Sequence, residues 1–109
     1  MNLLFVCSRN QWRSPTAEKI YSKKRGFSSK SAGTEPSARI KVSEGHLKWA
    51  DLIFVMEKKH KERLLQKFKD VLENKRIEIL EIEDEYRYMD QELISILEDS
   101  INPILQEYV

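Results

Sequence analysis

Cysteine, proline, glycine and long apolar runs are all scarce in this sequence. Cys7 is the only cysteine in 109 residues, which include three prolines and three glycines. One cysteine can form neither an internal disulfide nor a four-thiolate metal site. No run approaches the roughly 18 apolar residues of a membrane-spanning helix. Because no leader-like pattern is present either, we expect a cytoplasmic protein without membrane contact.

Metal-ligand patterns are also lacking. His46 and His60 are the only histidines, and each lies among charged or helical residues without the spacing of a metal site. We therefore expect no metal and no cofactor, and we assign neither histidine to a site.

Charge is nearly balanced overall, at +1, but it is divided along the chain. Residues 1–76 contain 18 basic residues (Lys and Arg) and 8 acidic residues (Asp and Glu). Residues 77–109 contain 1 basic residue and 10 acidic residues. A basic body attracts anionic ligands, but the simpler interpretation is that the acidic segment packs back over the basic one. The lysines lack interleaved aromatic residues or a known motif, so nucleic-acid binding is not expected.

Apolar strand-like segments alternate with segments of helical periodicity, and the length predicts one domain, residues 1–109. The alternation predicts an α/β fold, a three-layer α/β/α sandwich around a parallel sheet. The predicted strands are residues 2–6, 28–31, 52–56 and 76–82. The predicted helices begin at Ser14 (with Pro15 as the first helical residue and Gly26 as the stop), Ser43, Glu57 and Asp90, the last with a break near Pro103.

The single cysteine directly follows the first apolar strand. Ligands of parallel sheets bind beyond the carboxyl ends of the strands, where Cys7, the loop of residues 8–13 and the helix start at Ser14 must meet. A thiolate is stabilised at a helix N-terminus beside an arginine, and loop N–H groups bind phosphate. The pattern therefore predicts a phosphate-binding loop. The alternative is that Cys7 is only a small buried apolar residue.

Each residue of this segment has a predicted task. Cys7 attacks phosphorus to form a phosphocysteine, Arg13 binds two equatorial oxygens, and the loop N–H groups stabilise the transition state. Ser14 hydrogen-bonds the sulfur, and Asn10 braces a turn that needs a left-handed residue. The predicted substrate-binding positions in this segment are Ser8, Arg9, Asn10, Gln11, Trp12 and Ser14.

Three segments resemble the low-molecular-weight protein tyrosine phosphatases, over most of residues 2–65. They are Phe5-Val6-Cys7…Asn10…Arg13-Ser14-Pro15-Thr16-Ala17-Glu18, Ser31-Ala32-Gly33-Thr34, and residues 50–56. The resemblance implies a four-stranded parallel sheet in the order 2-1-3-4. It also implies metal-independent hydrolysis, with Cys7 as the nucleophile and Arg13 as the phosphate-binding residue. Asn10 and Ser14 match the family's loop-bracing and sulfur-contacting positions.

The general acid of that family, the aspartate of an Asp-Pro pair, has no direct counterpart. Asp84 is the predicted acid, because it follows the fourth predicted strand in a run of acidic residues. The alternatives are Glu83, Glu85 and Asp90, or that the run is only a solvated turn. The tyrosines predicted to line the cleft are Tyr86 and Tyr88.

Three further features depart from the family's pattern. The substrate-contacting segment between Thr34 and Ala50 is short, Trp12 stands where many members have a second cysteine, and Arg9 stands where the family prefers glycine. The short segment removes one wall of the cleft. The missing second cysteine means that oxidation of Cys7 leads to a sulfenic acid or a mixed disulfide.

These residues predict a cysteine-dependent phosphatase for phosphotyrosine or aryl phosphates, acting on a phosphorylated protein or a small aryl phosphate. The chain is expected to be a monomer or a weak dimer. One competing hypothesis is a phosphate-binding module without catalysis. Another is arsenate reduction, which needs an external thiol because a single cysteine cannot resolve its own adduct.

Overall fold

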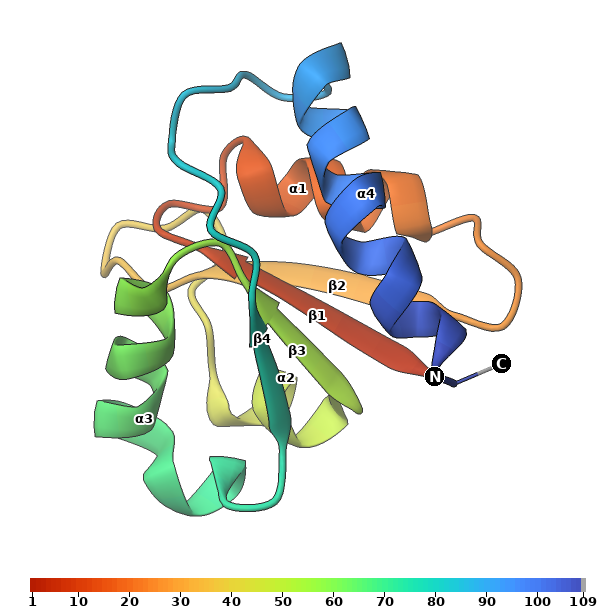
Figure 1. The fold of residues 1–109 in the computed structure, drawn as a ribbon. Helices are drawn as coiled ribbons and strands as arrows, with labels where there is room; N and C mark the ends of the chain where they lie inside the picture. The colour runs from red at the N-terminus through yellow and green to blue at the C-terminus, as the bar shows by residue number, and fades with distance from the viewer. Residues whose placement is uncertain (109) are drawn as a thin grey trace.

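The computed structural model describes residues 1–108, in which four strands alternate with four helices (Figure 1). The strands are β1 (Asn2–Cys7), β2 (Ser28–Gly33), β3 (Leu52–Val55) and β4 (Arg76–Ile79), and the helices are α1 (Arg13–Tyr21), α2 (Glu44–Trp49), α3 (Lys58–Leu72) and α4 (Gln91–Gln106). All neighbouring strands are parallel, in the order β2-β1-β3-β4. The predicted sheet and its strand order are confirmed.

Helices cover both faces of the sheet, with α1 and α4 on one side and α2 and α3 on the other (Figure 1). Successive side chains of a strand point to opposite faces. Leu3 and Phe5 of β1 therefore join the core under α1 and α4, whereas Leu4 and Val6 join the core under α2 and α3. Burial on both faces explains why β1 and β3 are apolar nearly throughout, and the predicted three layers are confirmed.

Tyr21 joins α1 to the sheet and to α4. Its ring stacks on Phe5 with centroids 5.7 Å apart, and its hydroxyl donates to Asn102 Oδ1 at 2.6 Å. Tyr21 is therefore a core residue. No helix within residues 1–108 has both the length and the apolar character that crossing a membrane requires.

The start of α1 differs from the prediction. The helix begins at Arg13, so Ser14 lies inside the first turn and is not the N-cap; its hydroxyl bonds to loop residues instead. Pro15 is tolerated there because the first N–H groups of a helix have no intrahelical acceptor. The helix ends at Tyr21, and Gly26, with φ of 89°, lies in the turn before β2.

Two predicted boundaries near the C-terminus are also wrong. Helix α4 continues through Pro103, because Ile101 and Leu105 on either side are buried in one core and their packing outweighs a lost hydrogen bond. Strand β4 ends at Ile79 rather than Ile82, since Glu81 has φ of 57°. The N–H of Ile82 nevertheless donates to the Met56 carbonyl at 2.8 Å.

Candidate active site

Cys7 is the last residue of β1 and lies where the loops after β1, β3 and β4 come together (Figure 1). Its side chain is 3% exposed, and its sulfur lies 2.9 Å from Ser14 Oγ on the first turn of α1. The strand end and the helix start that frame the loop are therefore in direct contact through these two side chains.

The loop keeps five consecutive backbone donors without a protein partner. Within residues 1–108, no N–H group of residues 8–12 donates a hydrogen bond to a protein acceptor. Backbone N–H groups in folded proteins are nearly always paired, and a row of free ones forms an anion-binding concavity. These free donors give the loop next to Cys7 the chemistry to bind an anion.

Asn10 holds this loop in shape, as predicted. Its φ is 58°, and its buried amide donates to Ser14 Oγ at 2.8 Å and to Ser31 Oγ at 2.9 Å. Gly33 lets β2 approach the loop, because a Cβ there would lie 2.5 Å from the Ser8 carbonyl oxygen. The loop conformation thus depends on residues of α1 and β2 as well as on its own sequence.

Arg13 is buried, and the hydrogen bonds of its guanidinium are made through Nη1. Its Nη1 donates to Glu57 Oε2 at 2.5 Å and to the Ile82 carbonyl at 2.8 Å, and its Nε lies 3.6 Å from Asp84 Oδ1. Nη2 has no protein partner within residues 1–108. The guanidinium is anchored through Nη1, and its Nε–Nη2 edge remains for the planar, bidentate contact that arginine makes with phosphate.

Glu57 is the anchor that the sequence analysis missed. Burial acts to raise the pKa of Glu57, but the hydrogen bond and the charge of Arg13 outweigh it, so the pKa of Glu57 lies below its usual value. Glu57 follows β3, and the carboxyl ends of parallel strands share one edge of the sheet. The position of Glu57 directly after an apolar strand was therefore the signal in the sequence, as it was for Cys7 after β1.

His60, to which the sequence pattern assigned no site role, contacts the loop through Ser8. Burial first, and then the charge of Arg13, lower the pKa of His60 to about 4, so its ring is neutral near pH 7. Its Nδ1 accepts from the Glu57 N–H at 3.0 Å, which places the proton on Nε2. Nε2–H therefore donates to Ser8 Oγ at 2.9 Å and leaves the Ser8 hydroxyl hydrogen available to a ligand.

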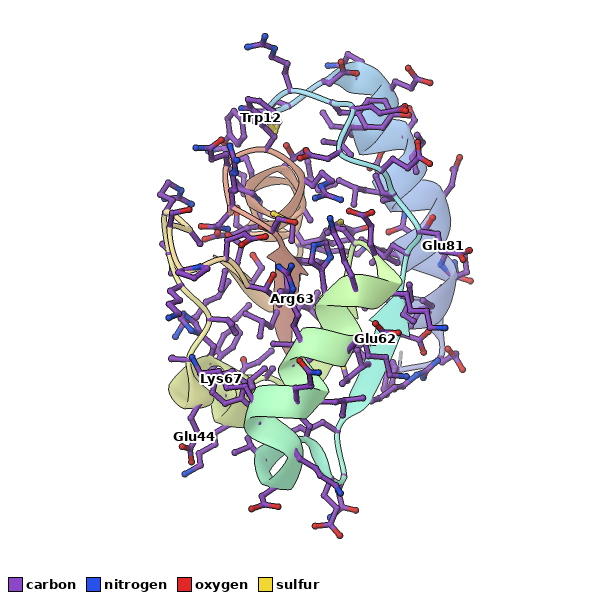
Figure 2. All side chains as sticks on the ribbon, turned by 90° about the vertical axis from the view of Figure 1, so that its left-hand side faces the viewer. Trp12, Glu44, Glu62, Arg63, Lys67 and Glu81 are labelled. Carbon is purple, nitrogen blue, oxygen red and sulfur yellow. The ribbon has the colours of Figure 1, made fainter. Side chains whose placement is uncertain are left out.

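A cavity of about 40 Å³ lies beside the loop, which is room for about one water molecule. Its lining residues are Arg9, Gln11, Trp12, Arg13 and Asp84. Of the four carboxylates proposed as the acid, Asp84 is the one on this lining. Trp12 lies at the outer end of the site (Figure 2), with the Arg87 guanidinium 5.4 Å from its ring centroid.

The other acid candidates are engaged elsewhere. Asp90 caps α4 by accepting the Glu92 N–H at 2.8 Å. A hydrogen bond and like charge from Glu83 raise the pKa of Glu85, and neither residue lines the cavity.

The two tyrosines expected to wall the cleft are not on the cavity. Tyr86 packs against the core under α1 and α4, and Tyr88 is 50% exposed. His46 serves α2, where its ring accepts the Ser43 N–H at 3.0 Å. Within residues 1–108, no cluster of three His, Cys, Asp or Glu side chains suited to a metal is present.

Neither a protein-family model nor a curated protein sequence matches this chain, but solved structures do. The low-molecular-weight protein tyrosine phosphatase from T. tengcongensis is 24% identical, with a TM-score of 0.75 over 98% of this chain and 99% of that one. The chain has the low-molecular-weight phosphatase fold. The tyrosine phosphatase Wzb from Escherichia coli K30, solved with phosphate, is 20% identical, with a TM-score of 0.77 over 97% and 96% of the two chains. The YwlE arginine phosphatase from Geobacillus stearothermophilus is 20% identical, with a TM-score of 0.73 over 98% and 94%.

Proposed function

We propose that the chain is a cysteine-dependent phosphatase that hydrolyses aryl phosphate monoesters, phosphotyrosine among them, through a phosphocysteine. The observation that carries the proposal is the row of five unpartnered N–H groups between Cys7 and Arg13. The similar solved structures support it, since they include tyrosine and arginine phosphatases and a YwlE mutant with a phosphorylated active-site serine.

In the first step, Cys7 Sγ forms a bond to phosphorus as the bond from phosphorus to the leaving oxygen breaks. Asp84, on the cavity wall, gives its proton to that oxygen. The loop N–H groups and the free edge of Arg13 bind the equatorial oxygens, where charge develops. Asp84 must leave its place beside Arg13 Nε for this, because the cavity holds only about one water.

In the second step, water attacks phosphorus and the bond to sulfur breaks. Asp84, now a carboxylate, takes the proton of the water. Ser14 Oγ lies 2.9 Å from the sulfur, and its hydroxyl group stabilises the departing thiolate by donating a hydrogen bond without transferring its proton. Inorganic phosphate and the starting form of Cys7 result, so the cycle closes without another reactant.

An aryl leaving group is favoured by Trp12. Its indole lines the cavity on the open side of the loop, and aromatic rings stack on one another at a gain of about 1 kcal/mol. Comparing phosphotyrosine with phosphoarginine as free substrates tests this choice. Faster turnover of phosphoarginine would contradict it and leave the cysteine chemistry standing.

The decisive experiment is steady-state hydrolysis of p-nitrophenyl phosphate with a chelator present. We expect turnover in the parent chain and a loss of at least about 1,000-fold in both Cys7→Ser and Arg13→Lys, because each removes a group that acts in the transition state. Arg25→Lys, on an exposed residue far from the loop, is the matched control and keeps full activity. Activity that needs a metal, or that survives Cys7→Ser, would overturn the proposal.

A phosphate-binding module without turnover is the competing function, and the exposed position of Asp84 favours it. The Asp84 side chain is 53% exposed and contacts Arg13 only at 3.6 Å. In an enzyme, Asp84→Asn removes the basic limb of the bell-shaped pH–rate profile, whereas Glu83→Gln keeps it. In a binding module, phosphate binds to the loop, turnover is negligible and Asp84→Asn changes nothing.

Arsenate reduction is tested separately. It requires turnover of arsenate with glutathione or thioredoxin as the external thiol, because Cys7 is the only cysteine of the chain.

A further inference from the structure

A second hollow lies on the other side of the short segment that follows β2. It has a volume of about 390 Å³ and runs between residues 34–42 and helix α3. Its rim is polar and basic and its floor is apolar, and the residues that matter are Thr34, Lys41, Arg63, Lys67, Leu64 and Phe68. We call it the α3 groove.

The α3 groove starts next to the phosphate loop. The N–H of Thr34, on its rim, donates to the Cys7 carbonyl at 3.0 Å, and the next N–H, of Glu35, donates to the Ser8 carbonyl at 2.9 Å. Neighbouring strands of a sheet lie only about 4.8 Å apart. A peptide whose phosphorylated side chain is bound at the loop of residues 8–12 therefore reaches the groove within a few residues.

Two cations of the groove have no acidic partner. Within residues 1–108, neither Lys41 nor Lys67 forms a salt bridge, whereas Arg63 pairs with Glu35 at 2.8 Å. Figure 2 shows Arg63 and Lys67 on one flank of α3, and Glu62 and Glu81 toward the other. The flank that borders the groove is thus the basic one.

Acidic residues border the end of the groove that lies away from the loop. Farther along, an adjoining hollow shares Lys67 and Phe68 with the groove and is also lined by Glu44 and Asp70. These carboxylates, together with Glu35 on the rim, would repel a polyanion laid along the whole length. A short acidic segment with an apolar residue matches the groove better than a nucleic acid does.

We infer that the α3 groove binds acidic residues, with an apolar neighbour, of a phosphorylated protein while the phosphorylated side chain is bound at the loop of residues 8–12. The inference rests on the proposed phosphatase function and adds a substrate class to it. The carboxylates of the substrate pair with Lys41 and Lys67, and its apolar side chain packs on Phe68 over the buried Leu64.

The test compares phosphotyrosine peptides of equal length. One carries glutamates and a leucine within three residues of the phosphotyrosine, on the N-terminal side in one version and the C-terminal side in another; the control has glutamines in place of the glutamates. We expect kcat/KM at low salt to be about fivefold to tenfold higher for one acidic version, mostly through KM, which is the effect of two exposed ion pairs. Raising the salt concentration reduces the difference.

The double variant Lys41→Glu/Lys67→Glu removes the preference and leaves hydrolysis of p-nitrophenyl phosphate within about twofold, because neither lysine lines the catalytic cavity. Lys61→Glu/Lys69→Glu is the matched control, since it makes the same charge change at two α3 residues outside the groove, and it retains the preference. A preference that is absent, or that survives in the double variant, would overturn the inference.

A binding measurement separates this inference from the proposed function. Fluorescence anisotropy of the labelled peptides on the Cys7→Ser variant needs no turnover, and we expect the same order of affinities there. If the parent chain does not hydrolyse p-nitrophenyl phosphate but acidic peptides still bind through Lys41 and Lys67, the phosphatase proposal is wrong. The inference that the α3 groove binds acidic peptides is then still supported. Equal affinities, or tighter binding of an RNA oligonucleotide through the same lysines, would refute the groove as a peptide site.

Discussion

The two loops that meet at the cavity are built in opposite ways. In and directly after the loop that follows β1, Asn10 and Arg13 are almost fully buried and bonded to α1, β2 and the β3–α3 turn. In the loop after β4, residues 83–85 and 87–88 are exposed. That loop is held by burial of Ile82, by Tyr86 against the core under α1 and α4, and by the Met89 N–H donating to Thr16 Oγ1 at 2.9 Å.

This difference suggests a division of labour. Binding a phosphate through free N–H groups requires donors fixed in advance, because a donor that must reorganise loses its advantage in the transition state. A proton donor must approach and leave the substrate, so a loop with few contacts suits it. Changes in the first loop should therefore affect both stability and activity, and changes in the second loop activity alone.

Among the changes that test this comparison of the two loops, the largest combined effect on stability and activity is expected at Asn10. Asn10→Ala leaves Ser14 and Ser31 without their donor and places a Cβ-bearing residue without side-chain support at positive φ. We expect a loss of about 2–4 kcal/mol in the free energy of unfolding and about 100-fold in kcat/KM. Asn10→Gly, which accepts the backbone conformation, should recover part of the stability and little of the activity. Near-normal urea unfolding of Asn10→Ala would show that the loop is not held in this way.

His60 should make the stability of the first loop depend on pH. Its folded pKa of about 4 lies below the unfolded value near ~6.5. Between these values the unfolded chain binds more protons, so the free energy of unfolding falls as the pH is lowered from about 6.5 to about 4, by up to about 3 kcal/mol. His60→Gln keeps a donor for Ser8, and its urea midpoint should lack this part of the decrease. Parallel curves for the two proteins would contradict the burial of a neutral ring.

A change at Glu57 tests how much the anchoring of Arg13 contributes to activity and to stability. Glu57→Gln keeps a hydrogen-bond acceptor for Arg13 Nη1 but removes the charge, and kcat/KM should fall about tenfold. The pKa of Glu57 is depressed in the folded chain, so its contribution to stability is present above the unfolded pKa and is lost as the pH falls through the folded one. Unfolding followed between pH 3 and pH 6 in both proteins measures this loss. The same acid limb in Glu57→Gln would rule out the ion pair as its source.

The smallest effect is expected at Tyr88, in the second loop. Its side chain is half exposed and does not line the cavity, so Tyr88→Ala should change kcat/KM for p-nitrophenyl phosphate by less than about twofold and leave stability within about 0.5 kcal/mol. A tenfold rise in KM would instead make Tyr88 a wall of the occupied site.

The sequence was sufficient for the site where the chemistry is local in the chain. Cys7, Asn10, Arg13 and Ser14 lie within eight residues, and a strand followed by a helix start leaves few ways to arrange the loop between them. Contacts that join distant segments were harder to see. Glu57 and His60 lie 44 and 52 residues from their partners Arg13 and Ser8, and nothing in their own neighbourhood distinguishes them from a charged helix start.

Some errors in helix boundaries have the same origin. Ser14 and Pro15 have the residue types of an N-cap and a first helical position, but the helix begins earlier because Ser14 is bonded to Cys7 and Asn10. Pro103 has the residue type of a helix break, but Ile101 and Leu105 keep α4 against the sheet. The conformational preferences of single residues contribute less free energy than these tertiary contacts. The contacts therefore determine where α1 begins and that α4 continues through Pro103.

By itself, the sequence determined the alternation of strands and helices and the loop that joins Cys7 to Arg13, because apolar periodicity and short-range spacing act along the chain. Only the tertiary structure decided that Glu57 binds the Arg13 guanidinium and that Asp84 borders the cavity. It also decided that the basic α3 groove lies next to the loop. Those depend on how far-apart segments are brought to one edge of the sheet, where burial and charge are set by neighbours that the local sequence does not specify.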